Sequence, residues 1–269
     1  MQNNEIAHKS FNFGGILMKY VLECCVDSVE SAIMAEKGGA NRLELCANLI
    51  IGGTSPSLAL FHEVKKNTNI RVHVLLRPRF GDFLYTDHEM NIIEEEVKMF
   101  REAGADGVVI GCLDADGNLD MPKMKRLVDA AGDMSITLHR AFDVCNDPFK
   151  ALEQCKELGV NTILTSGQKN SCLAGEELIR QLADKAEGKV DILAGAGVNA
   201  DVISKMVRST TLTSFHLSGK ITLDSGMKYR KEGVNMGLPS LSEYEVWQTK
   251  EENIRAAYNA LMEGLKERE

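Results

Sequence analysis

Eight short apolar runs recur along the chain, and the segment between each pair is long enough for a helix. The runs begin roughly 20 to 35 residues apart, which is the size of one strand–helix repeat. Each run is apolar on both faces, as is typical of parallel strands buried between a core and a layer of helices. We therefore predict strands at Tyr20–Val26, Arg42–Ala47, Val72–Arg77, Gly107–Leu113, Ser135–Asp143, Thr162–Ser166, Asp191–Val198 and Ser214–Lys220.

Eight such repeats predict an α/β fold of the (β/α)8 or TIM-barrel class. Gly39, Gly104 and Gly159 each stand between a helical segment and the next apolar run, where a helix commonly ends in a left-handed residue. An open doubly wound sheet is the alternative, but it usually has fewer strands and needs a switch point. Barrels of about 250 residues commonly fold as one domain, so we predict a single barrel domain over residues 18–269.

Residues 1–17 are polar and lack the apolar central region of a secretory signal, so we expect a disordered leader or an appended remnant. The net charge is −8 with no basic block, which argues against nucleic-acid and anionic-membrane binding. The cysteine count is seven, and no pair has the C-x-x-C spacing of a zinc ribbon. These features favour a reduced, cytoplasmic protein.

Active sites of barrels lie where strands end, at the face that we call the mouth of the barrel. Glu23 and Cys25 share one face of the first strand, and Glu44 and Cys46 share one face of the second. A charged Glu is costly against the helix layer, so these side chains are expected to point into the barrel. Catalysis is one interpretation of Glu23 and Glu44, and a pairing of each with an internal Arg or Lys is the other.

Arg77 ends the third predicted strand, and the fifth contains His139, Arg140 and Asp143. Alternation places His139 and Asp143 on one face of that strand and Arg140 on the other. Together with Glu23 and Glu44, the side chains of Arg77, His139 and Asp143 would form a charged ring at the mouth. Such a ring can hold an anion or transfer protons, and a buried ion-pair network that only fills the barrel is the alternative.

Small and polar residues follow the last three predicted strands. Barrel phosphate sites are commonly built from backbone N–H groups after strands seven and eight, where glycine lets the backbone approach an anion. Anion binding is therefore predicted here, with plain tight turns as the alternative. The residues concerned are Ser166, Gly167, Gly195, Gly197, Ser218, Gly219 and Lys220. The next segment, Ile221–Gln248, has little periodicity and is predicted to be a functional loop or an oligomer contact.

Ordered blocks across residues 18–269 resemble the CutC family of copper homeostasis proteins. They include Glu23-Cys24-Cys25-Val26-Asp27, Asn41-Arg42-Leu43-Glu44-Leu45-Cys46, Arg77-Pro78-Arg79, His139-Arg140-Ala141-Phe142-Asp143, Leu164-Thr165-Ser166-Gly167, Phe215-His216 and Asp224-Ser225-Gly226-Met227-Lys228. The resemblance implies a cytoplasmic barrel, a homodimer or larger homo-oligomer, and a role in copper tolerance. It also implies Cu(I) binding by two cysteines, which correspond to Cys25 and Cys46 here. Cys24 is extra to that pair, and residues 1–17 have no counterpart.

Two functional hypotheses follow. The first is a copper homeostasis protein that binds Cu(I) through Cys25 and Cys46, because soft thiolates suit this ion. The second is a barrel enzyme that acts on a small anionic molecule, phosphorylated or not. In it, the glycine-rich loops and Lys220 would hold the anion, Glu23, Glu44 or His139 would move protons, and Arg77 would stabilise developing charge. A third hypothesis is an interaction protein that works through Ile221–Gln248.

Overall fold

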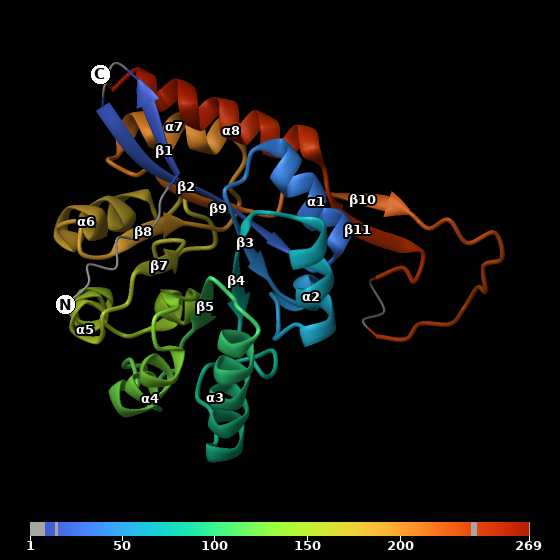
Figure 1. Cartoon of the computed structure of the whole chain (residues 1–269), viewed down its shortest axis with the longest axis horizontal. Coiled ribbons are helices and arrows are strands. Elements are labelled where there is room, and N and C mark those ends of the chain that lie inside the picture. Colours follow the sequence, from blue (N-terminus) through green and yellow to red (C-terminus); the bar gives the residue numbers. More distant parts are fainter. Residues whose placement is uncertain (1–8, 14–15, 238–240, 269) are drawn as a thin grey trace.

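The structure is a computed structural model that describes residues 9–13, 16–237 and 241–268. Eight parallel strands form a barrel, which closes where the last strand pairs with the first (Figure 1). The strands are β2 (Ile16–Val26), β3 (Arg42–Leu45), β4 (Arg71–Leu75), β5 (Gly107–Ile110), β6 (Ser135–Leu138), β7 (Thr162–Thr165), β8 (Asp191–Ala194) and β9 (Ser214–Leu217). The predicted TIM barrel is therefore confirmed.

A helix follows each barrel strand and covers the outside of the barrel (Figure 1). The helices are α1 (Val29–Gly38), α2 (Leu58–Asn67), α3 (Asp87–Glu102), α4 (Met121–Ala131), α5 (Pro148–Leu158), α6 (Glu176–Ala186), α7 (Ala200–Ser209) and α8 (Glu251–Lys266). The final helix, α8, packs against both α1 and α7 and so covers the seam between the first and last repeats. Its apolar face, which includes Ile254, Ala257 and Leu261, is fully buried. Among the described residues, no helix is long and apolar enough to cross a membrane.

The amino-terminal strand β1 (Lys9–Phe13) pairs antiparallel with the start of β2. The register runs from Lys9 opposite Tyr20 to Phe13 opposite Ile16. These five residues thus form a strand where the sequence led us to expect a disordered leader. The alternating pattern Ser-Phe-Asn-Phe, typical of a strand, is the signal that this expectation overlooked. The rest of that expectation falls on residues 1–8 and 14–15, outside the described residues, and on Ile16–Leu17, which begin β2.

The predicted strand Ser135–Asp143 is wrong in its second half. β6 ends at Leu138, and Arg140–Val144 form a short 3-10 helix, η2. His139 caps this helix, because its Nδ1 accepts a hydrogen bond from the N–H of Ala141 at 3.1 Å. Strand alternation therefore does not apply to His139, Arg140 and Asp143, and their positions follow from η2 instead.

A two-stranded hairpin leaves the barrel after β9. Its strands are β10 (Lys220–Asp224) and β11 (Glu245–Thr249), which pair antiparallel from Lys220 opposite Thr249 to Asp224 opposite Glu245. Figure 1 shows this hairpin and the chain beyond it extending away from the barrel. We call residues 220–249 the arm. The chain returns to the barrel through α8, which follows β11. Both ends of the arm therefore lie beside the mouth.

Candidate functional site at the barrel mouth

An ion network occupies the inside of the barrel below the mouth. Glu23 on β2 is 0% exposed and forms an ion pair with buried Arg42 on β3. Its second carboxylate oxygen lies 2.7 Å from Nδ1 of His216 on β9. Burial raises the pKa of Glu23, but Arg42 and His216 outweigh it and hold that pKa well below its usual range. Glu23 therefore has the internal Arg partner that the sequence suggested, and its predicted catalytic role stays a prediction.

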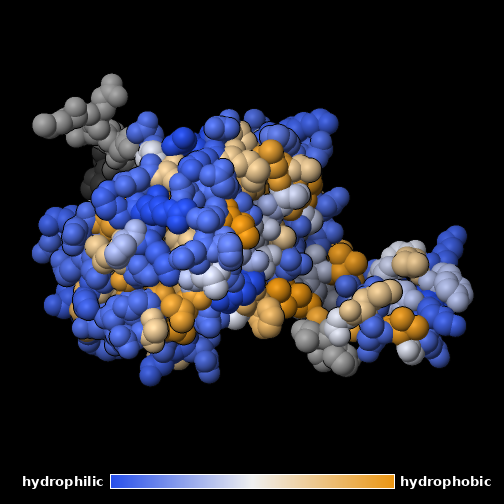
Figure 2. Space-filling view, turned by 90° about the horizontal axis from the view of Figure 1, so that it is seen from below, coloured by the Kyte–Doolittle hydropathy of each residue, from blue (hydrophilic) through white to orange (hydrophobic). Residues whose placement is uncertain are grey.

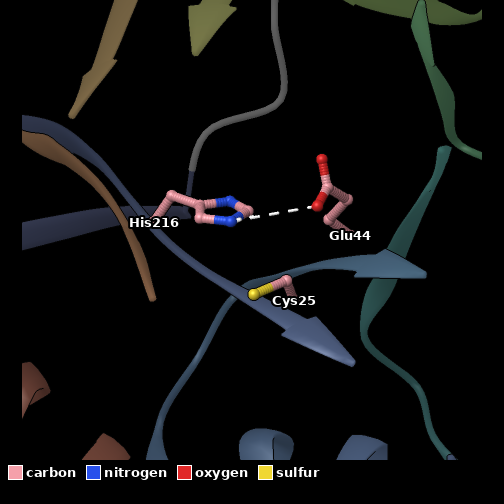
Figure 3. A group of neighbouring side chains, drawn as sticks. All are labelled: Cys25, Glu44 and His216. Carbon is pink, nitrogen blue, oxygen red and sulfur yellow. Dashed lines mark ion pairs between the residues drawn. The ribbon is translucent and has the colours of Figure 1, made fainter. Parts of the chain in front are cut away.

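Strand register then brings three potential metal ligands together above this network. Glu23 is opposite His216 in the β2–β9 pair, and Cys25 is opposite Glu44 in the β2–β3 pair. The ligand atoms of Cys25, Glu44 and His216 all lie within 4.8 Å of one another. Figure 3 shows the thiol and the imidazole facing the same space as the Glu44 carboxylate. We call these three residues the Cys–Glu–His cluster.

The electrostatics of the cluster follow from its burial and from its pairs of charges. Burial and the nearby Glu23 charge raise the pKa of Glu44 to about 7, although His216 and Arg42 oppose the shift. Burial alone would lower the pKa of His216, but Cys25, Glu44 and Glu23 reverse this and raise it. His216 Nε2 lies 3.8 Å from a Glu44 oxygen. Because Glu23 holds Nδ1, the Nε2 atom is the imidazole nitrogen that faces Cys25 and Glu44.

Cys46 does not belong to the cluster. The family resemblance implies that Cys25 and Cys46 bind one ion together, but the register makes Glu44 the partner of Cys25, and Cys46 lies two residues further along the chain. The Cys46 thiol is 3.5 Å from the carbonyl of Val26, and burial raises its pKa well above the usual value. A metal-binding role of Cys46 stays a prediction. Cys24 points out of the cluster, with its sulfur 3.5 Å from the carbonyl of Ser218.

A cavity of about 570 Å³ opens at the mouth, and the Cys–Glu–His cluster forms part of its wall. Its polar lining includes residues that we predicted as catalytic, metal-binding and anion-binding. It also includes His216, which we did not predict as a site residue. The block Phe215-His216, which resembles the CutC family, was a signal in the sequence, but the contact itself depends on the pairing of β9 with β2. The polar and charged lining residues are Cys25, Glu44, Arg77, His139, Arg140, Asp143, His216, Ser218 and Lys220.

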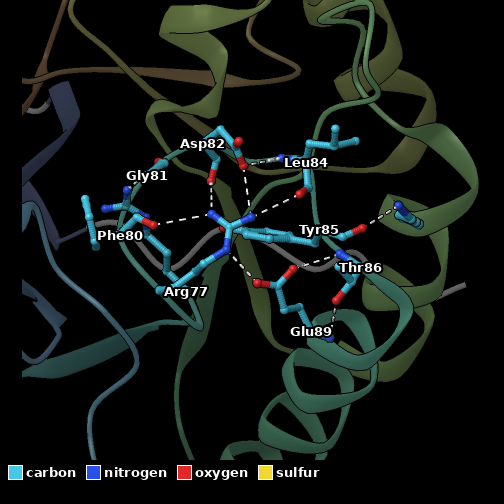
Figure 4. A network of polar contacts seen from close by, with 10 residues as sticks. Arg77, Phe80, Gly81, Asp82, Leu84, Tyr85, Thr86 and Glu89 are labelled. Carbon is cyan, nitrogen blue, oxygen red and sulfur yellow. Dashed lines mark hydrogen bonds and ion pairs between the residues drawn. The ribbon is translucent and has the colours of Figure 1, made fainter.

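Arg77 and His139 lie together on the side of the cavity formed by β4 and β6. The Phe83 ring contacts both of them, with its centroid 5.1 Å from the Arg77 guanidinium carbon and 4.8 Å from the His139 ring centroid. Burial and the Arg77 charge lower the pKa of His139 to about 3, so the imidazole is neutral at pH 7. The loop between β4 and α3 is held by Arg79, which bonds Asp82 and Glu89 (Figure 4).

Asp143 has partners that already occupy its carboxylate. It accepts hydrogen bonds from the Thr165 hydroxyl at 2.5 Å, from the Ser166 N–H at 3.0 Å and from Arg140 at 2.7 Å. These contacts fasten η2 to the end of β7. Asp143 and Ser166 therefore support each other. Their predicted catalytic and anion-binding roles are not tested by these contacts and stay predictions.

The predicted anion-binding residues divide between two places. Gly197, Ser218 and Lys220 line the cavity, whereas Ser166, Gly167, Gly195 and Gly219 do not. The backbone of Gly167 passes close to the backbone of Gly175, because a Cβ at Gly167 would come within 2.3 Å of the Gly175 carbonyl oxygen. The arm also reaches the mouth, where the ammonium group of Lys220 lies over the Trp247 ring and both residues line the cavity. Anion binding by these loops remains a prediction.

The fold and the site together define a TIM-barrel protein with a thiol–carboxyl–imidazole cluster at its mouth. The CutC family model matches residues 20–221, and the chain belongs to this family. A CutC protein of Bacteroides fragilis is 46% identical over 233 residues, covering 85% of this chain and 92% of its own length. The human copper homeostasis protein cutC homolog is 40% identical over 247 residues, covering 91% and 90% respectively.

Solved structures agree with this assignment. A crystal structure of CutC from Streptococcus agalactiae superposes with a TM-score of 0.71 at 30% identity, covering 74% of this chain and 98% of that one. Thiamine phosphate pyrophosphorylase from Pyrococcus furiosus superposes with a TM-score of 0.54 at 13% identity, covering 91% of this chain and 97% of that one. The second likeness concerns the barrel fold alone.

Proposed function

We propose that this chain acts in copper homeostasis by binding one Cu(I) ion at the Cys–Glu–His cluster, with Cys25 and His216 as its main ligands. The observation that carries the proposal is the convergence of three ligand atoms within 4.8 Å in a wall of the open cavity. Family membership supports the same conclusion, because relatives at 40–41% identity carry the name copper homeostasis protein.

The chemistry of the cluster fits copper. A thiolate is the soft ligand that Cu(I) prefers, and imidazole is also a good ligand for copper. Glu23 accepts from Nδ1 of His216 and leaves Nε2 for the ion, which is the carboxylate–histidine arrangement common beside protein-bound metals. Arg42 in turn fixes Glu23. The harder carboxylate of Glu44 suits Cu(I) less, so we assign it a secondary role.

A competition titration with a Cu(I)-selective chromophore under reducing conditions tests the proposal. We expect Cys25→Ser and His216→Gln each to weaken Cu(I) binding at least tenfold. Cys46→Ser should change it less, since Cys46 lies outside the cluster. Cys155→Ser is the matched control, because Cys155 is a buried cysteine of α5. Equal affinity in wild type, Cys25→Ser and His216→Gln would remove the cluster from copper binding.

A larger loss in Cys46→Ser than in His216→Gln would instead favour the two-cysteine site that the family resemblance implies. The resemblance also supports a cytoplasmic homodimer, which we include in the proposal. The described cysteines are all free thiols, as a reducing compartment would keep them. Cell fractionation checks the location, and light scattering of the purified protein checks the dimer.

A further inference from the structure

Two hydrogen-bond donors at the mouth cavity have no hydrogen-bond partner among the described residues. They are Nε2 of His139 and Nε of Arg77, and each atom is buried. A buried donor without a partner costs about 1–3 kcal/mol, so such groups usually have a function or a ligand. Both residues line the cavity, and neither belongs to the Cys–Glu–His cluster.

The tautomer of His139 follows from its contacts. Its side chain is only 4% exposed, and its Nδ1 accepts from the Ala141 N–H. A neutral imidazole that accepts at Nδ1 carries its proton on Nε2. Gly111 lies against Cε1 and Nδ1, where a Cβ would come within 2.7 Å of the ring. His139 is thus a neutral donor that backbone contacts hold in one orientation.

Arg77 carries a charge that no described carboxylate neutralises. Its terminal nitrogens donate to three backbone carbonyls, those of Gly52, Gly53 and Gly81, at 2.8–3.4 Å. Carbonyls fix the guanidinium without cancelling its charge. By contrast, the neighbouring cavity cation Arg140 is paired with Asp143. The side of the cavity around Arg77 and His139 therefore combines a positive charge with two donors that lack partners.

We propose that Arg77 and His139 form a binding site for a small organic carboxylate, whose two oxygens accept from Arg77 Nε and His139 Nε2. Planar carboxylates suit a guanidinium and a second donor. The rest of the cavity suits a short apolar body, since its wall there includes Leu49, Leu75 and Phe83. This site is separate from copper binding and does not depend on it.

Titration of the metal-free protein with propionate tests this, with inorganic phosphate as a second probe. Histidine-labelled ¹H–¹⁵N spectra report His139 directly, and calorimetry gives the affinity. We expect saturable propionate binding that shifts the His139 Nε2 signal. His139→Asn keeps an oxygen that can accept from the Ala141 N–H but removes the Nε2 donor, and it should weaken propionate binding about tenfold or more. Arg77→Lys should do the same.

Arg140→Gln is the matched control, because it removes a cavity cation that is already paired. It should leave propionate affinity within about twofold. Absence of saturable binding to the wild type would overturn the proposal, as would equal weakening by Arg140→Gln and Arg77→Lys. Tighter binding of phosphate than of propionate would overturn the carboxylate assignment. Circular dichroism shows that each variant is folded, and unchanged Cu(I) affinity in His139→Asn would separate this result from the copper proposal.

Discussion

Glu23 and Glu44 are two buried carboxyl groups only one strand apart, and their surroundings move their pKa values in opposite directions. Glu23 contacts both Arg42 and His216, so its charged form is favoured. Glu44 lies 3.8 Å from His216, and its burial outweighs the charges of His216 and Arg42, so its pKa is raised to about 7. Near neutral pH the network therefore holds one permanent negative charge and one carboxyl group that titrates.

Glu44→Gln in the metal-free protein should change how stability depends on pH. A folded-state pKa of about 7, above the usual 4.5, means that the folded protein binds a proton more tightly than the unfolded chain. The contribution of Glu44 to stability is then greatest below pH 4.5 and falls as the pH rises to 7. Gln does not titrate, so the stability of the variant relative to wild type should increase by up to about 3 kcal/mol between pH 4.5 and 8.

Urea unfolding at a series of pH values measures this difference. Glu95→Gln, at an exposed carboxylate of α3, is the control and should follow the wild type at every pH. A difference between wild type and Glu44→Gln that stays constant from pH 4.5 to 8 would contradict the raised pKa of Glu44.

At the scale of elements, the sequence was sufficient to predict where most of the barrel strands begin. The predicted starts of β3, β5, β6, β7, β8 and β9 coincide with the observed ones, because a buried parallel strand needs an unbroken apolar run. The strand ends were harder to predict. The run Ser135–Asp143 continues as η2 after Leu138, where Asp143 contacts Thr165 of β7 and the following Ser166.

The composition of the site was only partly predictable, since it depends on the stagger between neighbouring strands. Sequence shows that Cys25 and Cys46 each follow a Glu by two positions, but it does not show that Cys25 is level with Glu44. His216 enters the site through the pairing of β9 with β2, which lie 193 residues apart at this contact. Alternation along one strand carries no information about such pairing.

Asp143→Ala should test the contacts that hold η2. The substitution removes the acceptor shared by Thr165, Ser166 and Gln168 and leaves buried donors without partners. We expect a loss of about 2–4 kcal/mol in the free energy of unfolding. Asp143→Asn keeps one carbonyl acceptor and should cost less. Chemical denaturation measures both variants, and a loss below about 0.5 kcal/mol in Asp143→Ala would show that η2 is held by other contacts.

At the scale of the whole molecule, the described part of the arm is mostly exposed to solvent. Figure 2 shows hydrophobic side chains on it among hydrophilic ones, well away from the barrel. Met227, Tyr229 and Met236 are 58%, 70% and 83% exposed. Large apolar side chains that stand so exposed on an extended segment are typical of surfaces that contact another protein. This agrees with the predicted oligomer contact in Ile221–Gln248, which stays a prediction.

Replacing residues 226–243 with Asn-Gly tests the arm as the dimer contact. Ser225 and Tyr244 already share a hydrogen bond of 2.7 Å between N–H and carbonyl, so a two-residue turn can join the hairpin there. We expect the shortened protein to keep its barrel, with Lys220 and Trp247 still at the mouth, and to be a monomer by light scattering where the full chain is a dimer. A triple variant, Met227→Ser/Tyr229→Ser/Met236→Ser, keeps the arm length and should also weaken the dimer. If the shortened protein keeps the mass of a dimer, the interface lies on the barrel instead. The arm would then contribute only to the cavity at the mouth.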